Sequence, residues 1–193
     1  MEEIIQEDKH LLVYLNGLGS QTFDGFWITV STVAIWIPFY IILAYLLYKN
    51  YRLSSFVFIL IFIALGLTVS DQLANIFKHG IERFRPCHDP AIEAVIRKVK
   101  CGGRFGFYSG HASNTFFIAS FLSFVLGRKI RILPYVLFFW AALVSYSRIY
   151  LGVHFPMDIL MGAMMGFLLG GFFSTLARNV IAKQNRNSQN QSL

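Results

Sequence analysis

Residues 132–177 read ILPYVLFFWAALVSYSRIYLGVHFPMDILMGAMMGFLLGGFFSTLA. This stretch holds two apolar runs, Ile132 to Ile149 and Met157 to Ala177, each close to the roughly 20 residues that a helix needs to cross a bilayer. The boundary between the runs carries Arg148, His154 and Asp158. Ionisable side chains at membrane depth are energetically unfavourable and usually mark a functional site. The stretch therefore predicts two membrane helices with a polar site where they meet.

The rest of the chain has the composition of a membrane protein. Of 193 residues, 55% are hydrophobic and 14% are charged, whereas soluble domains average about 45–50% and about 25%. Three more apolar runs are Phe26 to Leu47, Leu53 to Phe77 and Ala112 to Leu126. The last is short for a roughly 30 Å hydrocarbon core, so its helix is expected to begin near Tyr108 or Ser109. We predict an all-α integral membrane fold with five transmembrane helices.

The predicted organisation has one membrane domain with a segment on either side. Residues 1–25 place apolar side chains at helical spacing among charged ones, which predicts an N-terminal interfacial helix. A solvated tail is the alternative. Residues 26–178 form the five-helix membrane domain, and the polar residues 179–193 are expected to be a disordered tail. In the last span, glycines every four residues predict close packing with another helix, within the chain or in a dimer: Gly162, Gly166 and Gly170.

Counting the spans places the polar segments on one side of the membrane. The amino terminus, the 78–109 loop and the 147–156 connection share that side, where every polar cluster then lies. The other side carries cations on short segments without acids: Lys49, Arg52, Arg128, Lys129, Arg131, Arg178, Lys183 and Arg186. The positive-inside rule assigns this second side to the cytoplasm. We therefore expect the polar site on the outer, periplasmic face of a bacterial-type plasma (inner) membrane.

Two cysteines, Cys87 and Cys101, lie in the loop expected outside. A disulfide between them would close a ring of about fifteen residues and restrict the unfolded loop by roughly 3 kcal/mol. Two free thiols are the first alternative. Metal ligation by Cys87, His88 and Cys101 is the second, although residues 102–104, Gly-Gly-Arg, offer no fourth ligand. We therefore predict a disulfide between the two cysteines and no bound metal.

Lys78 and Arg85 form the first cluster of a candidate phosphate site. Lys78 ends the second span, and Pro86 disfavours a helix at Arg85 and turns the chain there. A planar guanidinium and a compact ammonium can together hold a phosphate dianion. Contact with lipid headgroups is the alternative for Lys78 considered alone.

Ser109, Gly110 and His111 form the second cluster, at the start of the third span. A hydroxyl, a glycine that allows close backbone approach and the unpaired amides of a helix start together favour an anion site. The same residues are also common as plain helix starts.

Arg148, His154 and Asp158 form the third cluster. Pro156 suits the first turn of a helix, so Asp158, four residues after His154, can fold back toward the imidazole. A carboxylate that holds one ring nitrogen leaves the other free to attack phosphorus. A histidine hydrogen-bonded only for packing is the alternative.

These three clusters resemble the signature of the type 2 phosphatidic acid phosphatase (PAP2) family, whose core is similar to that of vanadium haloperoxidases. The resemblance runs from the second span to the fifth and implies a phosphohistidine mechanism without a metal or cofactor. It implies that His154 attacks, Asp158 orients it and His111 protonates the leaving oxygen. It also implies a set of phosphate-binding residues: Lys78, Arg85, Ser109, Gly110 and Arg148. Tyr108 departs from the family pattern, which has proline there, and this weakens any transfer of substrate identity.

The expected function is hydrolysis of a membrane lipid phosphomonoester or pyrophosphate. The basic stretch Arg97 to Arg104 favours a strongly anionic headgroup, so undecaprenyl pyrophosphate and lipid A phosphate rank first. The alternatives are a phosphatidic acid or phosphatidylglycerol phosphate phosphatase and a non-catalytic protein that binds or transports phosphate lipids. The expected partners are the lipid substrate and membrane lipids, with no nucleic acid and no obligatory protein partner.

Overall fold

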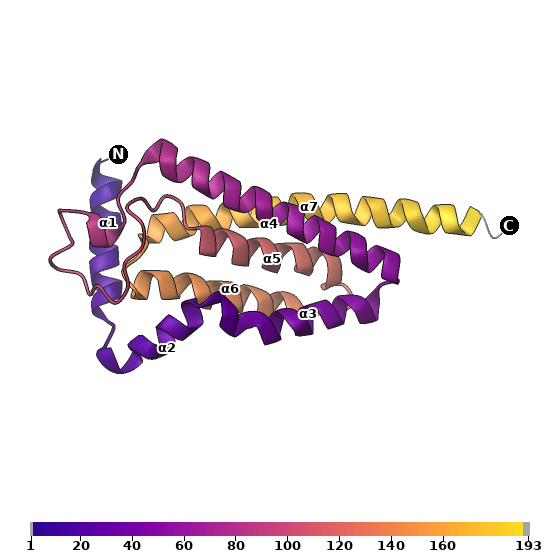
Figure 1. Cartoon of the computed structure of the whole chain (residues 1–193), viewed down its shortest axis with the longest axis horizontal. Coiled ribbons are helices and arrows are strands. Elements are labelled where there is room, and N and C mark those ends of the chain that lie inside the picture. Colours follow the sequence, from indigo (N-terminus) through magenta and orange to yellow (C-terminus); the bar gives the residue numbers. More distant parts are fainter. Residues whose placement is uncertain (1, 191–193) are drawn as a thin grey trace.

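The computed structural model describes residues 2–190, with side chains described through residue 184 and at residue 186. Within residues 2–190 the regular structure is helical, apart from an isolated bridge between Phe84 and Phe105. The long helices lie side by side along the long axis: α4 (Leu53–Ile81), α5 (Gly110–Leu126), α6 (Leu133–Tyr150) and α7 (Pro156–Asn190) (Figure 1). Helix α1 (Glu2–Gly17) crosses one end of this bundle. The all-helical expectation is confirmed.

The first expected span, 26–47, is not one continuous helix. Helix α2 (Gln21–Ser31) ends at Thr32, whose backbone is extended, and the 3-10 helix η1 (Val33–Trp36) leads into α3 (Ile37–Asn50). A proline in the first turn of α3 favours a helix start there, because its ring presets φ and the missing N–H would be unpaired anyway. The apolar pattern could not show this break, since both halves are equally hydrophobic.

The other helix starts lie within about a residue of the expected ones. Helix α5 begins at Gly110, capped by Ser109, so His111 lies in its first turn as predicted. The end of α7 differs, because the helix continues to Asn190 through most of the segment for which the sequence predicted disorder. No proline or glycine interrupts residues 172–190, so the long apolar helix can extend into the polar stretch. Residues 191–193 lie outside the described residues.

Glycines bring α5 and α7 into close contact. A Cβ atom on Gly162 would lie 2.5 Å from the Ser109 carbonyl oxygen, and one on Gly166 would meet the Ser113 carbonyl. A Cβ on Gly170 would lie 2.6 Å from the Phe117 carbonyl. The glycine spacing therefore serves packing within the chain, which confirms one of the two expected uses. It also brings the amino-terminal ends of α5 and α7 together.

The outer surface of the bundle is apolar. Large hydrophobic side chains on the outward faces are more than half exposed, as in Ile41 (63%), Leu65 (51%), Phe139 (70%) and Phe172 (59%). Among the described residues, segments 33–50, 53–81 and 156–184 are long and apolar enough to cross a membrane, and α5 is apolar but has 17 residues. Such a surface is suited to lipid rather than water as its surroundings.

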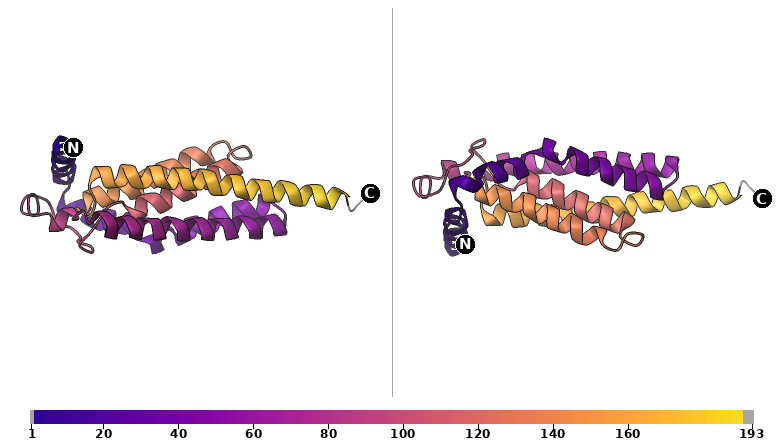
Figure 2. Two further views of the ribbon diagram at one scale, coloured as in Figure 1. Left: turned by 90° about the horizontal axis from the view of Figure 1, so that it is seen from above. Right: turned by 90° about the horizontal axis from the view of Figure 1, so that it is seen from below.

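The polar clusters gather at the end of the bundle that α1 crosses. Figures 1 and 2 show α1, the 82–109 segment and the α6–α7 turn together there, while the α3–α4 turn, the α5–α6 turn and the carboxyl-terminal end of α7 lie toward the opposite end. Leu12 anchors α1 through a small core with Ile92, Ile96, Ile149 and Phe155. The three clusters therefore lie together at one end of the bundle.

Candidate active site

A cavity of about 620 Å³ opens at this end and extends between the helices. Its polar lining combines cations and histidines with hydroxyls, an amide and one carboxylate: Ser31, Asp71, Lys78, Arg85, His111, Asn114, Thr115, Arg148 and His154. Apolar side chains line the remainder, mainly from η1, α3 and α4: Val33, Trp36, Tyr40, Leu43, Ala44, Leu47, Leu60, Ile63 and Leu67. Residues from all three sequence clusters thus line one cavity that joins an anion-binding end to a hydrophobic one.

His154, which lines the polar end of the cavity, lies beside the buried side chain of Asp158. Nδ1 of His154 is 3.4 Å from Oδ2 of Asp158, and the two side chains are 2% and 0% exposed. The same oxygen accepts a hydrogen bond from the Phe155 amide at 3.0 Å, which caps the start of α7. The four-residue spacing therefore folds the carboxylate back toward the imidazole, as the sequence suggested.

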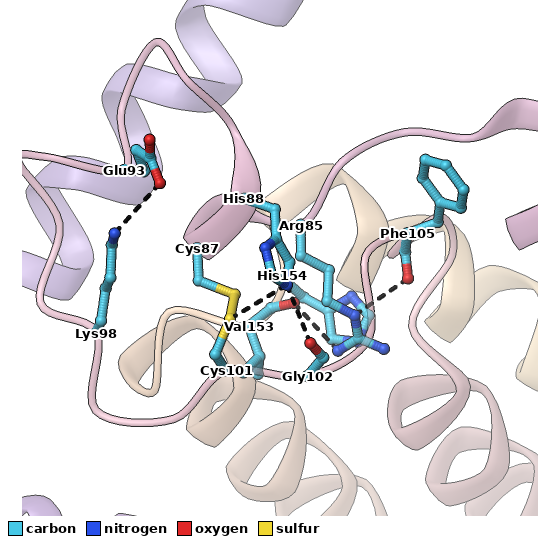
Figure 3. Close-up of a disulfide and its surroundings, with 10 residues drawn as sticks. All are labelled: Arg85, Cys87, His88, Glu93, Lys98, Cys101, Gly102, Phe105, Val153 and His154. Carbon is cyan, nitrogen blue, oxygen red and sulfur yellow. Dashed lines mark hydrogen bonds and ion pairs between the residues drawn. A yellow bond between two sulfur atoms is a disulfide. The ribbon is translucent and has the colours of Figure 1, made fainter.

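The other ring nitrogen of His154 faces the cations. Nε2 lies 3.5 Å from Nη1 of Arg85 (Figure 3). Burial, followed by the positive charges of Arg85, Arg148 and Lys78, lowers the pKa of His154 well below its usual value. The imidazole is therefore neutral at neutral pH, which leaves one nitrogen with a free electron pair.

Arg85 is held by backbone carbonyls from both flanking segments. Its Nε donates to the Phe105 carbonyl at 3.1 Å and its Nη1 donates to the Val153 carbonyl at 3.4 Å (Figure 3). Gly102 packs so closely that a Cβ there would lie 2.8 Å from Nη1. The guanidinium is thereby fixed beside His154, with donors left for an anion.

Cys87 and Cys101 form a disulfide next to this arginine (Figure 3). The bond joins the residue two positions after Arg85 to the residue just before Gly102, so it holds both walls around the guanidinium. His88 completes a group whose ligand atoms lie within 4.8 Å of one another. Both sulfur atoms are engaged in the disulfide, so this group does not offer two thiolates to a metal.

Arg148 and Lys78 complete the cationic end. Arg148 is 7% exposed and donates from Nη1 to the hydroxyl of Ser31, at the break between α2 and η1. Lys78 lies in the last turn of α4, and a Cβ on Gly110 would lie 3.9 Å from its Nζ. Among the described residues its ammonium makes no hydrogen bond or ion pair. Both charges are therefore available to a ligand anion in the cavity.

The start of α5 faces the same space. The Ser109 hydroxyl accepts from the Ala112 amide at 3.4 Å, and the Ser109 amide donates to the Asp158 carbonyl at 3.0 Å. Gly110 and His111 line the cavity. The helix start thus supplies a positive end and a second imidazole to the same cavity.

Sequence reasoning missed three residues around this site. Ser31 holds Arg148, Arg83 donates to Asp158 Oδ1 at 2.9 Å, and Asp8 pairs with Arg83 at 2.6 Å. Arg83 lies inside the first cluster, between Lys78 and Arg85, which was an available signal. No sequence signal pointed to the contact between Arg83 and Asp8, because the two residues are 75 positions apart. Asp71 lies within the bundle and accepts a hydrogen bond from Asn114 Nδ2 at 2.8 Å.

The arrangement can transfer a phosphoryl group. It places a neutral, buried imidazole between a carboxylate and several cations, and a second imidazole, that of His111, lines the same cavity. Cations fixed around developing phosphoryl charge stabilise a transition state with little reorganisation.

Comparisons with known proteins agree with this chemistry. The profile of the PAP2 superfamily matches residues 56–182. The lipid A 4'-phosphatase of Bacteroides thetaiotaomicron is 37% identical over 180 residues, covering 91% of this chain and 79% of that protein. The lipid A 4'-phosphatase of Porphyromonas gingivalis is 34% identical over 177 residues, covering 89% of this chain and 73% of that protein.

A solved structure supports the fold. The transmembrane PAP2 type phosphatidylglycerolphosphate phosphatase from Bacillus subtilis superposes with a TM-score of 0.70, at 22% identity over 93% of this chain and 89% of that one. Taken with the family profile and the relatives, the comparison leads to one conclusion: the chain belongs to the PAP2 superfamily and is a membrane phosphatase.

Proposed function

We propose that the chain removes a phosphate from a phosphorylated saccharide lipid of the lipid A type, through a phosphohistidine on His154. The main support for this substrate class is the cavity, in which the cationic end is continuous with apolar walls from η1, α3 and α4. A phosphate bound between Lys78, Arg85 and Arg148 would leave its acyl chains along those walls. A water-soluble phosphate has no apolar chains that could contact these walls.

In the first step, Nε2 of His154 attacks phosphorus while the bond to the lipid oxygen breaks. Asp158, beside Nδ1, stabilises the imidazolium that forms. His111 gives a proton to the leaving oxygen, and the lipid alcohol departs. Lys78, Arg85, Arg148 and the amides at the start of α5 hold the three phosphoryl oxygens, with Ser109 and Gly110 forming the turn.

In the second step, water attacks the phosphohistidine. His111, now neutral, takes a proton from that water as the phosphorus–nitrogen bond breaks, and inorganic phosphate is released. His154 returns to its neutral form and Asp158 keeps its position. No metal enters either step.

The relatives favour a saccharide lipid over the other substrates considered from the sequence. Both named relatives act on lipid A. The basic stretch that suggested a strongly anionic headgroup is partly neutralised, because Arg97 pairs with Asp24 and Lys98 pairs with Glu93. That weakens the charge argument for both strongly anionic headgroups, so the choice of a saccharide lipid rests on the relatives. Undecaprenyl pyrophosphate, phosphatidylglycerol phosphate and phosphatidic acid become comparison substrates for the test.

We also propose five membrane-crossing segments with the active-site end on the periplasmic side of the inner membrane. The disulfide lies at that end, and disulfides persist in oxidising compartments. The opposite end carries the cations that the positive-inside rule assigns to the cytoplasm. Helix α1, with exposed Ile4, Ile5 and Leu11, would lie along the membrane surface.

Purified protein in detergent tests the proposal against a lipid panel. Release of inorganic phosphate is measured from lipid A, undecaprenyl pyrophosphate, phosphatidylglycerol phosphate and phosphatidic acid, and mass spectrometry identifies which phosphate of lipid A is lost. We expect the highest kcat/KM with lipid A, unchanged by a chelator. Higher kcat/KM for the polyprenyl or glycerol lipids would overturn the substrate assignment, and loss of activity with a chelator would overturn the mechanism.

Variants at the two histidines separate catalysis from binding or transport. His154→Ala should bind the substrate with little change but form no covalent phosphate. His111→Ala should fall in turnover because both proton transfers slow. If ³²P-labelled substrate leaves no acid-labile label on the parent enzyme, or if His154→Ala retains turnover, the phosphohistidine assignment is wrong.

A further inference from the structure

Arg83 lies between two buried carboxylates. Its Nη1 donates to Asp158 Oδ1 at 2.9 Å, and its Nη2 donates to Asp8 Oδ2 at 2.6 Å. The Asp158 and Asp8 side chains are 0% and 2% exposed, and that of Arg83 is 20% exposed. One guanidinium therefore neutralises two acids that burial alone would disfavour as anions.

Asp8 reaches the same place from the N-terminal helix. Its Oδ1 accepts a hydrogen bond from the Met157 amide at 2.9 Å, in the first turn of α7. The Arg83 guanidinium also stacks over the Phe155 ring, 4.0 Å from its centroid. Helix α1, the segment after α4 and the start of α7 thus meet around Asp158, the residue that orients the proposed nucleophile.

We propose that Arg83 and Asp8 are positioning residues, which hold Asp158 ionised and aimed at His154. Helix α1 is then part of the support of the active site as well as a surface helix. This inference rests on the proposed roles of His154 and Asp158. Neither Arg83 nor Asp8 is among the described residues that line the cavity, so neither should contribute to binding of the phosphate.

The competing explanation is that the Asp8–Arg83 pair only docks α1 on the bundle. The chain offers a matched control for it. The neighbouring Lys9 pairs with Asp89 at 2.8 Å, with side chains 15% and 13% exposed. That ion pair also joins α1 to the segment after α4, but it does not contact Asp158. Breaking the Lys9–Asp89 pair should weaken the docking of α1 but leave the contacts among Asp8, Arg83 and Asp158 intact.

The experiment compares kcat, KM and thermal midpoint for Asp8→Asn, Arg83→Met, Arg83→Lys and Lys9→Met in the full-length protein. Asp8→Asn and Arg83→Met should each lower kcat at least about tenfold, or ~1.4 kcal/mol, with KM changed less than twofold. Arg83→Lys keeps the charge and should recover part of the kcat that Arg83→Met loses. Lys9→Met should keep the parental kcat.

Several outcomes would overturn the inference. One is parental kcat in Asp8→Asn and Arg83→Met; another is an equal loss of kcat in Lys9→Met, which would indicate docking alone. If Asp8→Asn and Arg83→Met do not fold, Arg83→Lys decides: a lowered kcat with the parental KM and thermal midpoint supports positioning, and a parental kcat refutes it. Retained turnover in His154→Ala would instead refute the proposed function, so the two failures are distinguishable.

Discussion

Nδ1 of His154 lies 3.4 Å from Oδ2 of Asp158, and both side chains are buried. At this ion-pair distance the carboxylate can stabilise the positive charge that attack at phosphorus creates. Asp158 is itself fixed by the Phe155 amide and by Arg83. These contacts fix the carboxylate beside the imidazole.

Asp158→Asn should leave the shape of the site nearly unchanged but remove the charge that stabilises the imidazolium. We expect kcat to fall by roughly 10²- to 10⁴-fold, as when an orienting carboxylate is lost from other catalytic histidines. The measurement is steady-state phosphate release, with the thermal midpoint recorded to confirm folding. A kcat within threefold of the parent would show that Asp158 has no such role.

The apolar part of the cavity should bind the lipid chains. Leu60→Trp fills it from α4, so KM for a long-chain lipid phosphate should rise by about tenfold, or ~1.4 kcal/mol. Hydrolysis of a short-chain analogue should change little. Leu65→Trp, on the same helix but outside the cavity lining, is the control and should match the parent. Equal KM values for the two variants would argue against this binding path.

The disulfide should matter for activity as well as stability. Replacing Cys87 and Cys101 with serine removes a restraint worth roughly 3 kcal/mol on the chain-entropy model. It also frees Gly102 to move away from Arg85, so kcat/KM should fall along with the free energy of unfolding. Activity assays and chemical denaturation of the double variant, and of the parent after reduction, check this. Unchanged kcat/KM in both would separate the disulfide from the phosphate site.

Close packing of α5 against α7 should tolerate no side chain at Gly166. Gly166→Ala places a methyl group against the Ser113 carbonyl, so we expect a destabilisation of about 1–3 kcal/mol, typical of overpacking. Gly171→Ala, whose Cβ would lie an ordinary 3.5 Å from Phe124, is the control and should be neutral or slightly stabilising. Thermal unfolding compares the two. A midpoint for Gly166→Ala equal to that of Gly171→Ala would contradict the tight contact.

The pH dependence should reflect the neutral state of His154. Burial and the surrounding cations lower the pKa of this histidine well below the usual 6.5, so the imidazole stays unprotonated and able to attack as pH falls through 6.5. The acid limb of kcat/KM, corrected for ionisation of the substrate phosphate by ³¹P NMR, should lie below that value. A corrected acid limb of kcat/KM at pH 6.5 or above would contradict the neutral state of His154.

Much of the site could be predicted from the sequence because its parts are local. His154 and Asp158 are four residues apart at a helix start, and Ser109 caps the helix that carries His111, so short-range rules place them. Hydropathy placed the long helices for the same reason. It failed at 26–47, where a break at Thr32 leaves the composition unchanged. That break places Ser31 beside Arg148.

The sequence by itself determined that the chain is a helical membrane protein and that three polar clusters lie at one end of its spans. Only the tertiary structure decided how those clusters are held, through Ser31 on Arg148 and Arg83 between Asp158 and Asp8. Hydropathy and helical spacing report each segment separately. Contacts between residues 75 or 117 positions apart depend on how whole helices pack, and no local pattern encodes them.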